Sequence, residues 1–275
     1  SMRLAIPTLA AAMTFALGAG TALAQNECAA GKTLKEGVLT IATGNPAYFP
    51  WVIDNDPSSG KGFEAAVAYE VAKRMGFPAD KVEWTSTTFD QAIQPGPKEF
   101  DFNLQQYSIT PEREQTIDFS DPYYAAAQAV LVRKPTVDAG AKPEVASLKG
   151  LKWGLAAGTT APALIAALVG PESEPMLYED TADVSEALKA GQIDATLMDL
   201  PSALYTAAVV LDDGVVLGQF PAGEDAADSF GLVFEEGNAL KDCANAALAE
   251  MKADGALAAI EAEWLAEATG APVIR

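Results

Sequence analysis

The sequence of 275 residues contains no histidine, and its 18 lysines and arginines are outnumbered by 38 aspartates and glutamates, giving a formal net charge of −20 at pH 7. Without histidine, the chain cannot form a histidine-based triad or a histidine metal site, and it lacks the commonest general base near neutral pH. A chain this acidic also lacks the basic surface that nucleic acids and anionic membranes require. We therefore expect neither nucleic acid nor a membrane surface as a partner.

Long apolar runs are also scarce, and the one exception stands at the start of the sequence. Arg3 precedes a mostly apolar segment that ends in the small-x-small pattern Ala22-Leu23-Ala24. This pattern predicts a signal peptide over residues 1–24 that is cleaved on export, which leaves a mature protein in the periplasm. A membrane anchor is the alternative, but Pro7 and two glycines interrupt the segment and no basic stop-transfer flank follows it.

The chain has only two cysteines, Cys28 and Cys243. An even number of cysteines in an exported chain favours a disulfide, which would tie the mature N-terminus to a helix near the C-terminus. Two reduced thiols are the alternative. No ladder of aspartates and asparagines resembles a calcium loop, so we expect neither a metal nor another cofactor.

What the sequence does contain is a faint internal duplication. A short strand and a glycine turn over residues 38–44 lead towards a helix over 63–75, whose apolar residues share one face. The same pattern returns as a strand over 151–158 and a helix over 161–169. Strands that alternate with helices predict parallel α/β units, one set in each half of the chain.

A second repeated pattern, helix then turn then strand, follows each of these units, over residues 89–104 and again over 184–198. Two extended apolar runs, 128–132 and 230–234, are predicted to cross between the two halves as a hinge. Ligands of such sheets lie beyond the carboxyl ends of the strands. The predicted boundaries are a first lobe over 25–126, a second lobe over 127–231, and a return to the first lobe over 232–275.

Arg113 is the residue in these loops with the most specific chemistry. Its guanidinium offers paired donors that fit a carboxylate, and it keeps its charge when buried. Ser108, five residues upstream, adds a hydroxyl that could reach the same anion. The alternative is a solvent-exposed ion pair with Glu112 or Glu114, which would contribute little to stability.

Several short motifs, in their order along the chain, resemble those of the periplasmic polar amino-acid-binding proteins that serve ABC importers. They are Gly62-Phe63-Glu64, Ser108 to Arg113, Asp118 to Tyr124, Leu148-Lys149-Gly150, Gly158-Thr159-Thr160 and Lys252-Ala253-Asp254-Gly255. The resemblance implies a two-lobed α/β fold of the type II periplasmic-binding class. Each lobe would be a mostly parallel sheet flanked by helices, and two hinge strands would let the lobes close around a ligand.

The resemblance also implies roles for particular residues. Arg113 matches the arginine that holds the α-carboxylate of the ligand, and Thr160 matches a residue at a helix start that contacts the same group. Asp199 matches the aspartate that receives the α-ammonium, although an N-cap before Leu200-Pro201 would explain it too. Tyr48 and Trp51 stand where the family supplies an aromatic wall.

Two departures from the family pattern favour a neutral polar ligand or an amino-acid derivative. Asn45 stands where proteins that select basic side chains often carry an acid, and Gln106 replaces a usual small residue. Whether Gln106 points into the cleft is left open by the sequence. The candidate ligand-binding residues are Arg113, Asp199, Thr160, Ser108, Tyr48, Trp51, Gln106, Asn45 and Thr159.

The function implied is that of a monomeric periplasmic receptor, not an enzyme, which binds a free amino acid and delivers it to an ABC-type permease in the inner membrane. The alternative is a dehydratase acting on cyclohexadienyl acids, because the same fold hosts such an enzyme. That reaction would need an acid such as Glu64 or Asp199.

Overall fold

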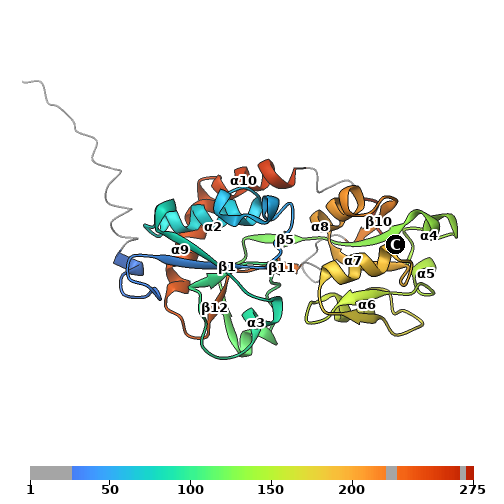
Figure 1. Cartoon of the computed structure of the whole chain (residues 1–275), viewed down its shortest axis with the longest axis horizontal. Helices are drawn as coiled ribbons and strands as arrows, with labels where there is room; N and C mark the ends of the chain where they lie inside the picture. Colours follow the sequence, from blue (N-terminus) through green and yellow to red (C-terminus); the bar gives the residue numbers. More distant parts are fainter. Residues whose placement is uncertain (1–26, 221–227, 267–270) are drawn as a thin grey trace, which may run out of the picture.

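The computed structural model describes residues 27–220, 228–266 and 271–275. The predicted signal peptide lies outside these residues. The described chain forms two lobes that lie side by side and are joined by a narrow pair of extended segments (Figure 1). The expected two-lobed α/β fold is therefore confirmed. No helix in the described part of the chain is long and apolar enough to cross a membrane.

The first lobe is built on a five-stranded sheet in the order β2-β1-β3-β12-β4. Its strands are β1 (Leu39–Thr43), β2 (Val82–Ser86), β3 (Phe102–Asn103), β4 (Ile117–Phe119) and β12 (Val233–Glu235). β1 runs parallel to both of its neighbours, whereas β12 runs antiparallel to β3 and β4. Four of the five strands therefore point the same way, as expected for a mostly parallel sheet, and β12 runs opposite to them because it enters the sheet on the return from the second lobe.

Helices cover this sheet on both faces. They are α2 (Phe63–Arg74), α3 (Phe89–Ile93), α9 (Leu240–Ala253) and α10 (Ala256–Leu265), with 3₁₀ turns η1 (Ile53–Asn55), η2 (Pro57–Ser59), η3 (Ala79–Lys81) and η4 (Arg113–Gln115). Phe63, Val67 and Val71 lie on the predicted apolar face of α2 and are fully buried in the core. Thr88 closes a capping box at the start of α3, which explains why this short helix begins there.

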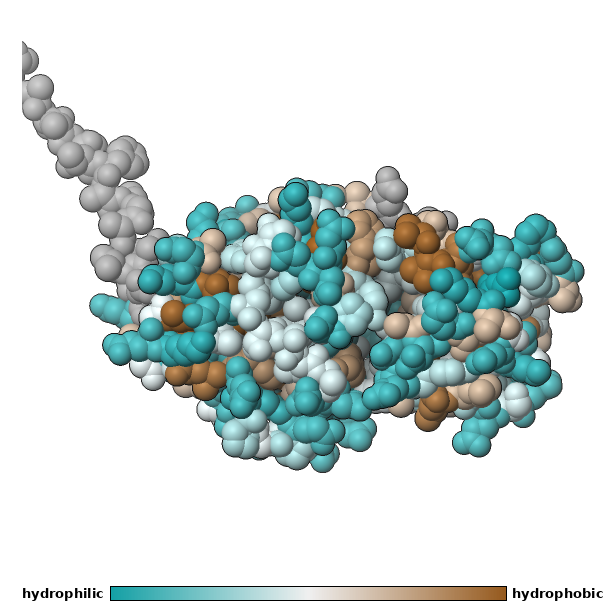
Figure 2. Space-filling view, viewed as in Figure 1, coloured by the Kyte–Doolittle hydropathy of each residue, from teal (hydrophilic) through white to brown (hydrophobic). Residues whose placement is uncertain are grey.

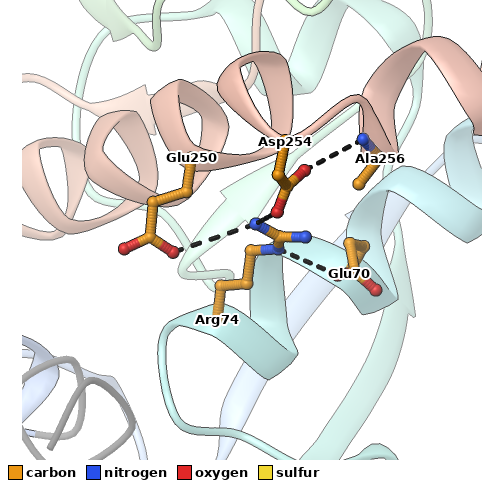
Figure 3. A network of polar contacts seen from close by, with 5 residues as sticks. All are labelled: Glu70, Arg74, Glu250, Asp254 and Ala256. Atoms are coloured by element: carbon orange, nitrogen blue, oxygen red, sulfur yellow. Dashed lines mark hydrogen bonds and ion pairs between the residues drawn. The ribbon is translucent and has the colours of Figure 1, made fainter. Parts of the chain in front are cut away.

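An ion-pair network holds α2 against the junction of α9 and α10 (Figure 3). The Arg74 guanidinium donates to Glu70 at 2.8 Å and to Asp254 at 2.6 Å, and Glu250 lies 3.9 Å away. Asp254 also accepts a hydrogen bond from the backbone N–H of Ala256, at the start of α10. One partly buried guanidinium therefore fixes the turn between α9 and α10 to α2.

The second lobe has a three-stranded sheet in the order β10-β6-β9 and a parallel pair, β7-β8. The strands are β6 (Gln128–Arg133), β7 (Gly154–Ala156), β8 (Met176–Tyr178), β9 (Ala195–Asp199) and β10 (Gly214–Phe220). A parallel bridge between Trp153 and Ala195 joins the two groups of strands. The helices are α4 (Lys134–Asp138), α5 (Val145–Leu148), α6 (Ala161–Leu168), α7 (Thr181–Lys189), α8 (Leu200–Tyr205) and the π-helical turn η5 (Thr206–Val210).

The hinge lies just upstream of where the sequence pattern placed it. β5 (Tyr124–Ala126) and β11 (Asp228–Phe230) pair antiparallel between the lobes. The runs predicted to cross, 128–132 and 230–234, mostly form β6 and β12, which are interior strands of the two sheets. The apolar runs belong to buried strands of the two sheets. The hinge was missed because it contains polar residues such as Asp228 and Ser229.

The sequence pattern predicted that all of residues 232–275 return to the first lobe. Residues 271–275 do not, because they pack against the second lobe. The N–H of Gln219 in β10 donates to the carbonyl of Pro272 at 2.7 Å, and the N–H of Ile274 donates back to Gln219 at 2.9 Å. The Ile274 side chain is buried in the hydrophobic core of the second lobe. The chain therefore ends on the second lobe, as the C label in Figure 1 shows.

Most of the surface seen in Figure 2 is hydrophilic, and hydrophobic residues appear there in small, separate patches. Among the described residues, the large apolar side chains that are exposed are Leu34, Phe49, Met176, Leu177, Val209 and Val273. This distribution fits the excess of acidic residues in the sequence.

The expected disulfide between Cys28 and Cys243 is present, and it closes a loop with a sequence separation of 215 residues. Cys243 lies on the buried face of α9, so the bond attaches the first described residues to the core of the first lobe. The covalent link restricts the unfolded chain far more than the folded one.

We predict that the double substitution Cys28→Ser and Cys243→Ser lowers the free energy of unfolding by about 3–5 kcal/mol, as expected for a long closed loop. Urea denaturation with and without a thiol reductant measures this difference. The reductant should destabilise the wild-type protein and leave the double variant unchanged. Equal stability of wild type and variant without reductant would contradict the prediction.

Candidate functional site

A cavity of about 270 Å³ lies between the two lobes. Its walls come from the segments that follow the carboxyl ends of the strands, where ligands of α/β sheets bind. These segments follow β1, β3, β7, β8 and β9, and they meet residues of β6 and of the hinge strand β11. Eight of the nine candidate residues line the cavity: Asn45, Tyr48, Gln106, Ser108, Arg113, Thr159, Thr160 and Asp199.

Arg113 connects the two lobes across this cavity. It begins the 3₁₀ turn η4 and is 9% exposed. Its Nη1 donates to the carbonyl of Ser108 at 2.8 Å, and its Nη2 donates to the carbonyl of Gly158, in the other lobe, at 2.9 Å. Phe89 lies 5.4 Å from the guanidinium carbon. Burial lowers the pKa of Arg113, so an anion nearby would stabilise its charge.

Asp199 ends β9 and caps α8. Its Oδ1 accepts a hydrogen bond from the backbone N–H of Ser202 at 2.9 Å. Burial raises the pKa of Asp199 to about 6, although hydrogen bonds from Ser202 act in the opposite direction. The residue is therefore an N-cap and also a wall of the cavity, where a buried carboxylate favours a cationic partner.

Trp51 is the candidate that does not line the cavity. Its side chain is fully buried and packs edge-on against Phe63, Tyr124 and Phe230. Its indole N–H donates to the Ser202 hydroxyl of the second lobe at 2.8 Å. Trp51 thus lies in the core behind the cleft rather than forming an aromatic wall, because the hydrogen bond turns its polar edge towards the other lobe.

The backbone N–H of Gln106 donates to Glu64 Oε1 at 2.9 Å, and its side-chain nitrogen donates to Glu64 Oε2 at 2.7 Å. Gln106 therefore lines the cavity while its amide nitrogen is hydrogen-bonded to Glu64. The Tyr123 hydroxyl also donates to Glu64. Glu64 is 1% exposed and is not among the residues that line the cavity. It is therefore poorly placed to act as the acid of an enzyme.

The remaining candidates have partners within the protein. The Thr159 hydroxyl donates to the carbonyl of Ala156 at 2.7 Å, while the Thr160 hydroxyl donates to Asp228 Oδ2 at 2.8 Å. The Asn45 side-chain oxygen accepts from the Asn55 amide at 3.3 Å. Both hydroxyls at the start of α6 are therefore hydrogen-bonded within the protein.

Tyr48 faces the second lobe across the cleft. Burial raises the pKa of its phenol, and the nearby Asp180 raises it further, while a hydrogen bond with Thr181 opposes both effects. The aromatic ring of Phe49 contacts that of Tyr205, with the ring centroids 4.8 Å apart. This loop of the first lobe therefore contacts two helices of the second.

Several lining residues were missed by the sequence reasoning. They include Asp90, Gln128, Glu179, Asp180 and Asp228. Glu179 and Asp180 follow β8, a short exposed strand with no clear pattern, and Asp228 stands in the hinge. The rule that ligands lie beyond strand ends would have found the first two residues had β8 been predicted.

The model of the family named bacterial extracellular solute-binding proteins, family 3, matches residues 39–267. The chain belongs to this family. Among curated proteins, the L-cystine-binding protein of Escherichia coli is 28% identical over 235 residues, covering 85% of this chain and 84% of that protein.

Two solved structures are also similar to this family 3 solute-binding protein. An ancestral arginine-binding protein bound to arginine has a TM-score of 0.67 and 28% identity, and the match covers 84% of this chain and 99% of that one. An ancestral amino acid-binding protein, described as a precursor of cyclohexadienyl dehydratase, has a TM-score of 0.65 and 29% identity over 83% and 95% of the two chains. The type II periplasmic-binding fold is therefore confirmed.

We predict a distinctive pH dependence of stability from Glu64 in this solute-binding protein. Burial raises its pKa from 4.5 to about 7, so the folded state holds a proton that the unfolded state releases between these values. Stability from this group is full below pH 4.5 and is lost as the pH rises towards 7, by about 3 kcal/mol in total.

The substitution Glu64→Gln should remove this loss. Chemical denaturation of both proteins between pH 5 and pH 8 measures it, and the stability of the variant relative to wild type should increase as the pH rises. The difference between the two proteins, rather than either curve alone, isolates Glu64 from other titrating groups. Parallel curves across this range would show that the pKa of Glu64 is not raised.

Proposed function

We propose that this family 3 member is an exported receptor that binds an amino acid or amino-acid derivative in the interlobe cavity and delivers it to an ABC-type permease. The observation that carries the proposal is the presence of Arg113 and Asp199, one from each lobe, on the walls of a single cavity. Opposite charges on the walls of one cavity favour a small polar or charged guest over an apolar one.

The roles follow from the geometry. Asp199 would receive the ammonium group of the guest, because the hydrogen bonds that its carboxylate accepts from Ser202 leave it capacity for more. Arg113 would hold the anionic side of the site and, through Gly158, keep the lobes together. Tyr48 and Gln106 would bound the side chain of the guest. A neutral polar side chain stays a prediction, drawn from Asn45 and Gln106.

The residues of the site favour a binding protein over an enzyme. The chain has no histidine, and Glu64, one of the two acids considered for a dehydratase, is buried away from the cavity. Asp199 already serves as the N-cap of α8. Each relative described above is called a binding protein, although one of them is the precursor of an enzyme.

The proposal predicts that at least one amino acid or amino-acid derivative raises the melting temperature of the protein. Asp199→Asn should weaken binding of that compound at least 100-fold, because the ammonium group of the guest loses its carboxylate partner. Arg113→Ala should weaken it to a similar extent, because it removes the hydrogen bond to Gly158 that holds the two lobes together around the cavity. A thermal-shift screen of the twenty amino acids with their amides and amines identifies the compound, and isothermal titration calorimetry measures both variants.

Asp138→Asn is the matched control, since Asp138 is an exposed residue of α4 that pairs only with Lys134 among the described contacts. It changes the net charge as Asp199→Asn does and should leave binding unchanged. The proposal fails if no compound in the screen stabilises the wild-type protein, or if both site variants bind as tightly as the control.

A further inference from the structure

Asp228, at the start of hinge strand β11, accepts hydrogen bonds from several donors in the cavity. Its Oδ2 accepts from the Thr160 hydroxyl at 2.8 Å and from the Gln128 side-chain amide at 2.7 Å. The Ser108 hydroxyl also hydrogen-bonds to this carboxylate, and the charge of Arg113 lies near enough to lower its pKa, although burial raises it overall.

These donors come from both lobes, and together they form an anion site. Two hydroxyls and an amide donate to one carboxylate, and the positive charge of Arg113 lies near it, which is a set of groups suited to an anion. In this protein the carboxylate belongs to the chain itself. The anion site of the cavity is therefore already filled by Asp228.

The charges around the cavity make a second carboxylate unfavourable. Among the described residues that line it, Arg113 is the one basic side chain, whereas five are acidic. The acidic residues are Asp90, Glu179, Asp180, Asp199 and Asp228. A guest carboxylate would have to share Arg113 with Asp228, and two carboxylates at one buried site repel each other unless one of them binds a proton.

The same arrangement favours a cation. Asp199 and Asp228 are close enough that the charge of Asp228 raises the pKa of Asp199. Gln128 lies between them, because it pairs with Asp199 in the register of β6 and β9 and donates to Asp228. With Arg113 balanced by Asp228, the remaining carboxylate of Asp199 faces the cavity without a basic partner among the described contacts.

We propose that Asp228 is a specificity-determining residue that takes the place of a guest carboxylate, so that the receptor prefers amines or guanidines derived from amino acids by loss of the α-carboxylate. The inference rests on the proposed function, because it assigns the cationic group of the guest to Asp199. It narrows the guest to one chemical class through charge repulsion, a common source of specificity.

Matched pairs of compounds test this inference. The pairs are L-arginine with agmatine, L-lysine with cadaverine, and L-glutamine with 4-aminobutanamide, which differ within each pair only by the α-carboxylate. Calorimetric titration of the protein, after dialysis to remove co-purified solutes, gives the dissociation constants. For the pairs that bind, the wild-type protein should bind the amine at least tenfold more tightly than the amino acid.

Asp228→Asn tests the residue itself, since it removes the charge and keeps the shape. The variant should bind the amino acid at least tenfold more tightly than wild type does, and the amine more weakly, so that the preference falls or reverses. Asp228→Ser should change the preference for the amine in the same direction. It serves as a second variant because the asparagine amide could itself make a new contact with the guest. Asp121→Asn removes the same charge from an exposed turn and should leave the preference unchanged.

The outcomes separate the inference from the proposed function. If wild type binds amino acids more tightly than the matching amines, and Asp228→Asn keeps that ratio, the inference is overturned while the receptor function stands. If none of the six compounds binds and the wider amino-acid screen also fails, both are overturned. A gain in amino-acid affinity on removing Asp228 would support the inference, because a residue that helps to hold an amino acid would show a loss.

Discussion

The architecture of the cleft depends on one interaction, the contact of the buried Arg113 guanidinium with both lobes. Its bonds to Ser108 and Gly158 span the cavity, and burial makes its charge costly unless an anion is near. The positive φ of Gly158 strains any residue with a side chain there, and an added Cβ would lie 2.4 Å from Asp90 Oδ1. The lobes can meet at this point because glycine lets a backbone carbonyl approach the guanidinium.

A second set of contacts couples the closed lobes to the cation side of the site. Trp51 donates to Ser202 across the lobes, and Ser202 hydrogen-bonds to Asp199. Trp51, which was expected to form a wall against the ligand, therefore acts through Ser202 on Asp199, which lines the cavity. Closure and the position of the Asp199 carboxylate are linked through one hydroxyl, without any contact between Trp51 and a guest.

Much of the fold could be predicted from the sequence, because local patterns decide it. The helix over 89–93 and the starts of helices at Phe63 and Ala161 agree with the structure, since apolar periodicity and capping residues are local signals. The sequence pattern placed the hinge too far along the chain and assigned residues 271–275 to the wrong lobe. An apolar sequence shows that a segment is buried, but it does not show in which lobe. Residues 271–275 cross to the second lobe through backbone hydrogen bonds that leave no pattern in the side chains.

For the site, the charged groups and their order along the chain follow from the sequence: Arg113 after one strand, Asp199 after another, and no histidine anywhere. Which of these groups share a cavity, and which anion lies near Arg113, depends on the folded chain. Asp228 lies 115 positions from Arg113 in the numbering of this chain, and no local rule relates the two. The hinge brings them together, because electrostatic pairing depends on distance in space and the sequence records only distance along the chain.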